Sequence, residues 1–351
     1  MRPVASSLVG TTEVQRASAR RIRIPPFCIR IGDKIDLSRT EQQSKPPSKL
    51  LLEHCSFSSY SYLSNAQDWE LTMQPAPGVD VSIRQAHPMD PWIKHAPTII
   101  TVGMIVILAL HGRIAQPAHY HDFADQSVAS GIPHAADVLS NVGFALVAIW
   151  GWLTLRPRRA SAQLRGGWPG YRLFLIGLLL TAFGSAFYHL APDNFSLIWD
   201  RLPIAVVCAG LLAGVRGDIH GGSQNKIDVI VLAFCAIASV AWWVITDRNG
   251  AGDLRPYLLL QGLALILIPL WQAIYRSPRA DRIAFASAMG LYILAKVAEL
   301  LDHEIAAAFG FVTGHTLKHL IATAATAAVV WGLTRRFSRA PVANPPCPLA
   351  G

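Results

Sequence analysis

Three histidines lie where long apolar segments of the chain begin or end. His189 closes one apolar run, and His315 and His319 open the last one. Residues four apart on a helix are separated by about 40° in projection and about 6 Å along the axis, so His315 and His319 can face one ion. Three imidazoles with an open fourth position are typical of a catalytic zinc site. The histidines therefore predict a zinc centre, which would lower the pKa of water and polarise a carbonyl group.

Two further polar residues belong to the same predicted region. Ser185 lies four residues before His189, and Asp200 stands near the start of the next apolar run. A carboxylate beside such a centre can accept a proton from water, and a hydroxyl can stabilise an oxyanion. Taken singly, a histidine or serine in a membrane helix more often packs or hydrogen-bonds to a neighbouring helix. Because they occur together, we expect Asp200 and Ser185 to be catalytic.

The composition is typical of an integral membrane protein. Hydrophobic residues make up 52% of the chain, charged residues make up 15%, and the mean hydropathy is +0.34. Most of the apolar segments approach the roughly 20 residues that a helix needs to cross a bilayer. They fall at roughly 97–112, 135–155, 172–191, 199–215, 227–246, 256–275, 283–301 and 311–334. The predicted fold is therefore an all-α polytopic transmembrane bundle of eight helices.

The distribution of charge predicts the orientation of this bundle. Arginines gather in alternate connections, at 156–172, 276–282 and 335–339, and aspartates gather in the others. Basic loops stay in the cytoplasm, so we expect both ends of the bundle there and the histidines toward the opposite face. The net charge of +9 follows from this topology, and no nucleic-acid partner is expected. The Ala- and Arg-rich composition favours the inner membrane of a bacterium.

The two ends of the chain differ from the apolar body. Residues 1–90 are rich in Ser, Pro, Arg and Gln and have no sustained apolar period. They are either a disordered extension or a mis-annotated one, with the true start at Met73 or Met89. No apolar stretch of the signal-peptide kind follows the early arginines. Residues 339–351 are predicted to be a disordered tail. This leaves 91–338 as the transmembrane catalytic domain.

At the polar residues the chain resembles the alkaline ceramidases. The resemblance rests on Ser-x-x-x-His at 185–189, an aspartate eleven residues later, and His-x-x-x-His in the last helix. The wider superfamily includes adiponectin-receptor-like proteins. The match covers roughly 119–335, which is seven of the eight segments, so the first helix is an addition. It implies that the three histidines hold zinc, that Ser185 and Asp200 act beside it, and that a ceramide-like lipid amide is hydrolysed to a fatty acid and a sphingoid-type amine.

A weaker resemblance to the same family concerns calcium. Alkaline ceramidases carry an Asp-Trp-x-Glu-x-Asn stretch before their first helix and a further Glu within it. The corresponding residues here are Asp122, Phe123, Asp125, Ser127 and Asp137. Oxygen ligands persist, as calcium requires, but their side chains are shorter. Asp122, Asp125 and Asp137 are therefore either calcium ligands or ordinary acidic residues of an outer loop.

Other charged residues lie close to the predicted site. Lys296 and Glu299 are three residues apart in the seventh segment and are expected to pair. Asp302 and His303 follow at the outer end of that segment. They either cap the helix or act as outer partners of the metal centre.

Three classes of function remain open on the sequence alone. The first is the hydrolase, and the second is a lipid-binding receptor or sensor with a structural zinc held by four protein ligands. The third is a transporter or purely structural membrane protein, although the chain lacks visible inverted repeats or pairs of broken helices. Metal analysis separates the third class from the others, and a lipid-hydrolysis assay separates the first two. The lipid substrate, a preference for amide or ester, and the oligomeric state are not specified by the sequence.

Overall fold

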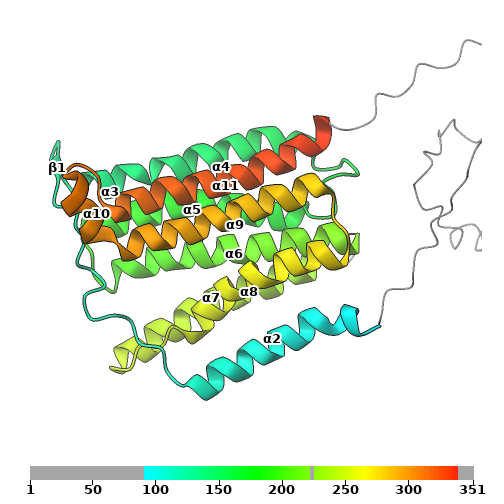
Figure 1. The fold of residues 1–351 in the computed structure, drawn as a ribbon, viewed down its shortest axis with the longest axis horizontal. Helices are drawn as coiled ribbons and strands as arrows, with labels where there is room; N and C mark the ends of the chain where they lie inside the picture. Colours follow the sequence, from blue (N-terminus) through cyan, green and yellow to red (C-terminus); the bar gives the residue numbers. More distant parts are fainter. Residues whose placement is uncertain (1–90, 222–224, 339–351) are drawn as a thin grey trace, which may run out of the picture. The chain divides into compact units, whose positions relative to one another are not determined.

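The computed structural model describes residues 91–221 and 225–338 and is almost entirely helical (Figure 1). The long helices are α2 (Pro91–His111), α4 (Val142–Leu155), α5 (Trp168–Leu190), α6 (Ser196–His220), α7 (Asn225–Arg248), α8 (Arg255–Ile274), α9 (Arg279–Leu300) and α11 (Gly314–Ser338). The short ones are α3 (Ala135–Ser140) and α10 (Asp302–Phe309), with a 3₁₀ turn at Arg156–Arg158. Within the described ranges, eight segments are long and apolar enough to cross a membrane, with α3 and α4 forming one of them. The predicted all-α polytopic bundle is confirmed, whereas the predictions for 1–90 and 339–351 lie outside the described residues.

The distribution of side chains is that of a protein surrounded by lipid. Large apolar side chains are exposed around the bundle, such as Leu153 and Phe183, each at 67%. In contrast, Asp137 and His189 are fully buried. Ionisable side chains in membrane proteins are found inside the bundle because contact with hydrocarbon is costly. The polar interior is therefore where a functional site is expected.

Helices α5 and α6 pack closely because glycines remove side chains from their contact. Gly170, Gly177 and Gly184 repeat every seven residues along α5. A Cβ atom at Gly184 would lie 1.9 Å from the backbone oxygen of Trp199, and one at Gly170 would lie 2.1 Å from the backbone nitrogen of Gly214. Small residues allow membrane helices to approach in this way. The close approach fixes the distance between the C-terminal end of α5 and the first turn of α6.

A break between α3 and α4 turns two polar side chains inward. Ser140 Oγ and Asn141 Nδ2 each donate a hydrogen bond to the carbonyl oxygen of Asp137, at 2.8 Å. Such bonds compete with the helical ladder, and the helix is interrupted at Asn141. Before α3, strands β1 (Val128–Ala129) and β2 (Ile132–Pro133) form a short antiparallel hairpin. Its two turn residues, Ser130 and Gly131, both have positive φ, as two-residue hairpin turns of this type require.

The first helix lies at the edge of the bundle. Helix α2 packs against α8, and none of its most apolar window is buried inside the protein (Figure 1). This placement agrees with the sequence-based expectation that the first segment is an addition to the other seven.

The α5–α6 contact predicts a sensitive glycine. Replacing Gly184 by Ala should destabilise the protein by about 1–3 kcal/mol, because the new methyl group overlaps the backbone of Trp199. Thermal unfolding in detergent measures the effect. Gly290→Ala is the matched control, since a Cβ there meets nothing within 4 Å and helix propensity then favours Ala. Unfolding of Gly184→Ala at the wild-type temperature would contradict the close-packing account.

Candidate metal centre

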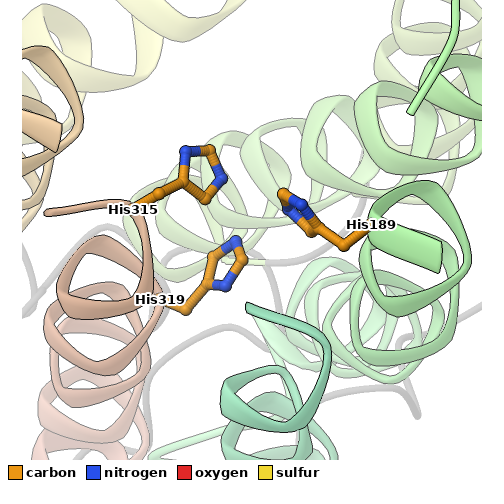
Figure 2. Close-up of side chains that lie close together, drawn as sticks. All are labelled: His189, His315 and His319. Atoms are coloured by element: carbon orange, nitrogen blue, oxygen red, sulfur yellow. The ribbon is translucent and has the colours of Figure 1, made fainter. Parts of the chain in front are cut away.

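The three predicted histidines converge at one end of the bundle. His189 comes from the last turn of α5, and His315 and His319 come from the first two turns of α11 (Figure 2). Their candidate ligand atoms all lie within 4.8 Å of one another, and all three side chains are buried. Nitrogens that share a tetrahedral zinc lie about 3.4 Å apart, given Zn–N distances of about 2.0–2.1 Å. Small side-chain rotations would therefore bring the imidazoles to coordination distance.

The hydrogen bonding of the cluster fits a metal ion. Both ring nitrogens of His189 and Nε2 of His319 are buried without a hydrogen-bond partner among the described residues. Leaving buried polar atoms unpaired costs about 1–3 kcal/mol each. Several unpaired nitrogens around one point are the donor set that a zinc ion or a similar transition-metal ion requires. The histidine group is also the only one of its kind, with three or more metal-binding side chains, in the described chain.

The ring of His319 is oriented by residues at the α3–α4 break. Its Nδ1 lies 2.8 Å from Ser140 Oγ, which itself donates to the carbonyl of Asp137. Because that donation uses the hydroxyl proton, Ser140 Oγ accepts from His319, and we assign the ring proton to Nδ1 on this basis. The lone pair of Nε2 is then free for a metal. An outer partner of this kind is typical of metal-binding histidines.

Asp137 belongs to this cluster. It is fully buried, and its Oδ1 accepts a hydrogen bond of 2.5 Å from Thr316 on α11. Its Oδ2 is unpaired and lies 3.9 Å from His189 Nδ1. Asp137 thus offers either a hydrogen-bond acceptor for His189 or a fourth ligand. From the sequence, Asp137 was predicted to be a possible calcium ligand together with Asp122 and Asp125.

A partly buried ion pair adjoins the histidines. Lys318 Nζ lies 2.8 Å from His315 Nε2 and 3.0 Å from Glu299 Oε1. Glu299 also accepts from Lys296 at 2.5 Å, which confirms the predicted pair. Because an ammonium only donates, Lys318 uses the lone pair of His315 Nε2 in this arrangement. Coordination by His315 would therefore use Nδ1 or displace Lys318.

Asp302 fixes the start of α11 beside the cluster. Its Oδ1 accepts from the backbone N–H of His315 at 2.7 Å, and its Oδ2 accepts from the N–H of Ala124 at 2.9 Å. One carboxylate therefore joins the loop between α2 and β1 to the first turn of the helix that carries two of the histidines. Phe123, from the same loop, covers the cluster, with ring centroids 4.7 Å from His189 and 4.5 Å from His315. Asp302 thus acts as a positioning residue.

The three predicted calcium ligands, Asp122, Asp125 and Asp137, do not form a metal-binding group in the described residues. Asp122 is exposed and lies 3.9 Å from His303 Nε2. The two oxygens of Asp125 accept from the backbone N–H groups of Ser127 and Asp137, each at 2.9 Å. Burial raises the pKa of Asp125, but hydrogen bonds from the Ser127 side chain and from nearby backbone N–H groups outweigh it and hold the pKa below its ordinary value. Asp125 thus stabilises the loop, and calcium binding stays a prediction for which the described residues offer no assembled site.

Ser185 and Asp200 line a cavity next to the histidines. The cavity has a volume of about 180 Å³ and is also lined by His319 and Lys318. Its remaining wall is largely apolar and comes from α4, α5, α6, α8, α9 and α11. Along α11 it extends from Lys318 to Val329, which is about 16 Å at 1.5 Å per residue. The arrangement places a hydroxyl, a carboxylate and an ammonium at the polar end of a narrow apolar cavity.

Comparison with known proteins gave no matching family model, no matching curated protein and no matching solved structure. The functional argument below therefore rests on the side chains of this site.

The donor set predicts the metal content of the protein. The chain purified in detergent should contain about one zinc per molecule, measured by elemental mass spectrometry. His189→Ala, His315→Ala and His319→Ala should each lose most of it, because two imidazoles bind a metal far more weakly than three. His303→Ala, at an exposed histidine, is the control and should keep the metal. Full retention in all three cluster variants would refute the centre.

Proposed function

We propose that the chain is a membrane-embedded, zinc-dependent hydrolase that cleaves the amide bond of ceramide-like lipids to a fatty acid and a sphingoid-type amine. The observation that supports this most strongly is the buried three-histidine group at the polar end of an apolar cavity. Zinc bound there would supply a Lewis acid and a water of lowered pKa.

The polar residues of the cavity would have separate roles in such a reaction. Asp200 makes no hydrogen bond to another described residue, so its carboxylate is available to accept a proton from water. The Ser185 hydroxyl is likewise uncommitted and can donate to the oxygen that becomes negative. Lys318, held by Glu299, adds a positive charge at the same end. In a water-poor site such fixed charges act more strongly than in water.

The apolar wall accounts for the class of substrate. Its side chains, such as Phe174, Leu178 and Val329, can receive an extended hydrocarbon chain whose head remains near Asp200. Burial of apolar surface stabilises the bound lipid by about 0.8 kcal/mol per methylene group. The polar head of the lipid, with its amide, then lies where the uncommitted polar groups are.

A lipid-binding receptor or sensor with a structural zinc is the second candidate. The observation that favours it is the unpaired Oδ2 of Asp137, 3.9 Å from His189, because a fourth protein ligand would close the coordination sphere. Such a protein would bind the lipid in the same cavity without cleaving it.

The proposal predicts a separation of metal binding from turnover. Asp200→Asn should keep the metal and the lipid but lower the rate of amide hydrolysis about 10²–10⁴-fold, because the proton acceptor is lost. Ser185→Ala should lower the rate of amide hydrolysis by a smaller factor than Asp200→Asn does. The control is Glu304→Gln, which changes an exposed carboxylate outside the cavity and should keep full activity. The assay measures fatty acid released from a panel of long-chain lipid amides and esters.

Two outcomes of this assay decide between the candidates. If wild-type protein with one zinc per chain binds lipid amides but cleaves no amide or ester of the panel, the receptor is correct. If Asp137→Asn loses the metal while Asp200→Asn keeps full activity, the carboxylate roles assigned here are wrong.

A further inference from the structure

A second cavity lies at the end of the bundle opposite the histidines. Its volume is about 560 Å³, within the range of about 300–1,000 Å³ that is typical of ligand pockets. Its wall includes Tyr171 near the start of α5, whereas His189 stands at the end of that helix, about 27 Å farther along the axis. The cavity is therefore independent of the candidate metal centre.

The floor of this cavity is a compensated charge network. Arg336 on α11 lies 2.8 Å from Asp218 on α6 and 3.1 Å from Asp281 on α9. Tyr171 donates a hydrogen bond of 2.5 Å to Asp218. The network joins four helices and leaves the guanidinium of Arg336 fully engaged. These paired residues form part of the cavity wall, but none of them offers a positive charge that is free to bind an anion.

The rim, in contrast, carries cations without partners. Arg165, Arg276 and Arg335 line the cavity and are exposed, and none forms an ion pair with a carboxylate in the described ranges. Arg335 stacks on the ring of Trp331, and Arg276 has a φ of 51°, a left-handed conformation that is unusual for this residue type. Arginines are common at the cytoplasmic face of a membrane protein, which is the face predicted here. That preference does not explain a cavity between them.

A buried amide also faces this cavity without a partner. Gln272 on α8 is only 4% exposed and lines the cavity, and its side chain makes no hydrogen bond to any residue that the structure describes. Its amide atoms are not among the fully buried atoms without a partner, so they reach the cavity and can bond to water or to a ligand there. With four arginines and two aspartates, the lining has a formal charge of +2.

We propose that this cavity binds the phosphate group of an anionic phospholipid, with Arg165, Arg276 and Arg335 as the anion-binding side chains and Gln272 as a further donor. Guanidinium groups are well suited to phosphate oxygens. The lipid is favoured over a soluble phosphate ester because the cavity lies at the ends of membrane-spanning helices, the level at which headgroups lie. Basic pockets between helices at such a face are a common form of headgroup site.

The test uses the full chain, purified in detergent and depleted of lipid. Added phosphatidylglycerol should raise the temperature of thermal unfolding and should be retained in native mass spectrometry, whereas phosphatidylcholine should do neither. The double variant Arg165→Gln/Arg276→Asn should bind phosphatidylglycerol about 30-fold more weakly, because each phosphate contact is lost independently. Asn at 276 tolerates the positive φ, so the turn should still form. Gln272→Leu should weaken binding about tenfold.

Arg279→Gln is the matched control, since this exposed arginine begins α9 three residues after Arg276 but does not line the cavity. It should bind phosphatidylglycerol as the wild type does. The site would be refuted if phosphatidylglycerol and phosphatidylcholine raised the unfolding temperature of the wild type equally. It would also be refuted if Arg279→Gln weakened phosphatidylglycerol binding as much as the double variant does. If glycerol phosphate without lipid raised the unfolding temperature by the same amount, the ligand would be a soluble phosphate ester and not a lipid.

Discussion

The cost of burying polar atoms inside a membrane bundle is the constraint on which this structure depends. His189 has no hydrogen bond from either ring nitrogen, and Asp137 leaves one carboxylate oxygen unpaired beside it. These atoms face one another at the meeting point of α3, α5 and α11. An isolated arrangement of this kind would destabilise the fold, and a bound cation removes the penalty because it satisfies several atoms at once. A metal ion bound at this point would therefore explain why these polar side chains are tolerated where they lie.

The rest of the fold holds the helix ends that meet at this point. The glycines of α5 bring its backbone against α6, so that Ser185 and Asp200 reach the same cavity. Asp302 joins the loop between α2 and β1 to the backbone of His315, and Ser140 orients the ring of His319. At the other end, the network around Arg336 links four helices and leaves a separate cavity between them. The same helices thus carry a different group of polar side chains at each end.

Much of this could be predicted from the sequence, for physical reasons. Apolar segments of bilayer length predicted the eight spans, and the i, i+4 spacing predicted that His315 and His319 face one ion. The position of His189 at a helix end on the same side of the bundle predicted that it joins them. The role of Asp137 was not predicted, because its contact with Thr316 joins residues 179 positions apart. The role of Lys318 was not predicted either, although it lies between His315 and His319 in the sequence. A charged residue in an apolar helix is usually functional, and this signal could have identified Lys318 as part of the site. Which oxygen or nitrogen each side chain offers depends on rotamers, which spacing alone does not specify.

X-ray absorption at the zinc edge of the purified protein tests the central claim most directly. The account predicts a four-coordinate shell with three imidazole nitrogens at about 2.0–2.1 Å and one oxygen, and the loss of one imidazole contribution in any metal that His319→Ala retains. A six-coordinate shell of oxygens, or a shell with fewer than three imidazoles in the wild type, would contradict the assignment of His189, His315 and His319 as the metal centre.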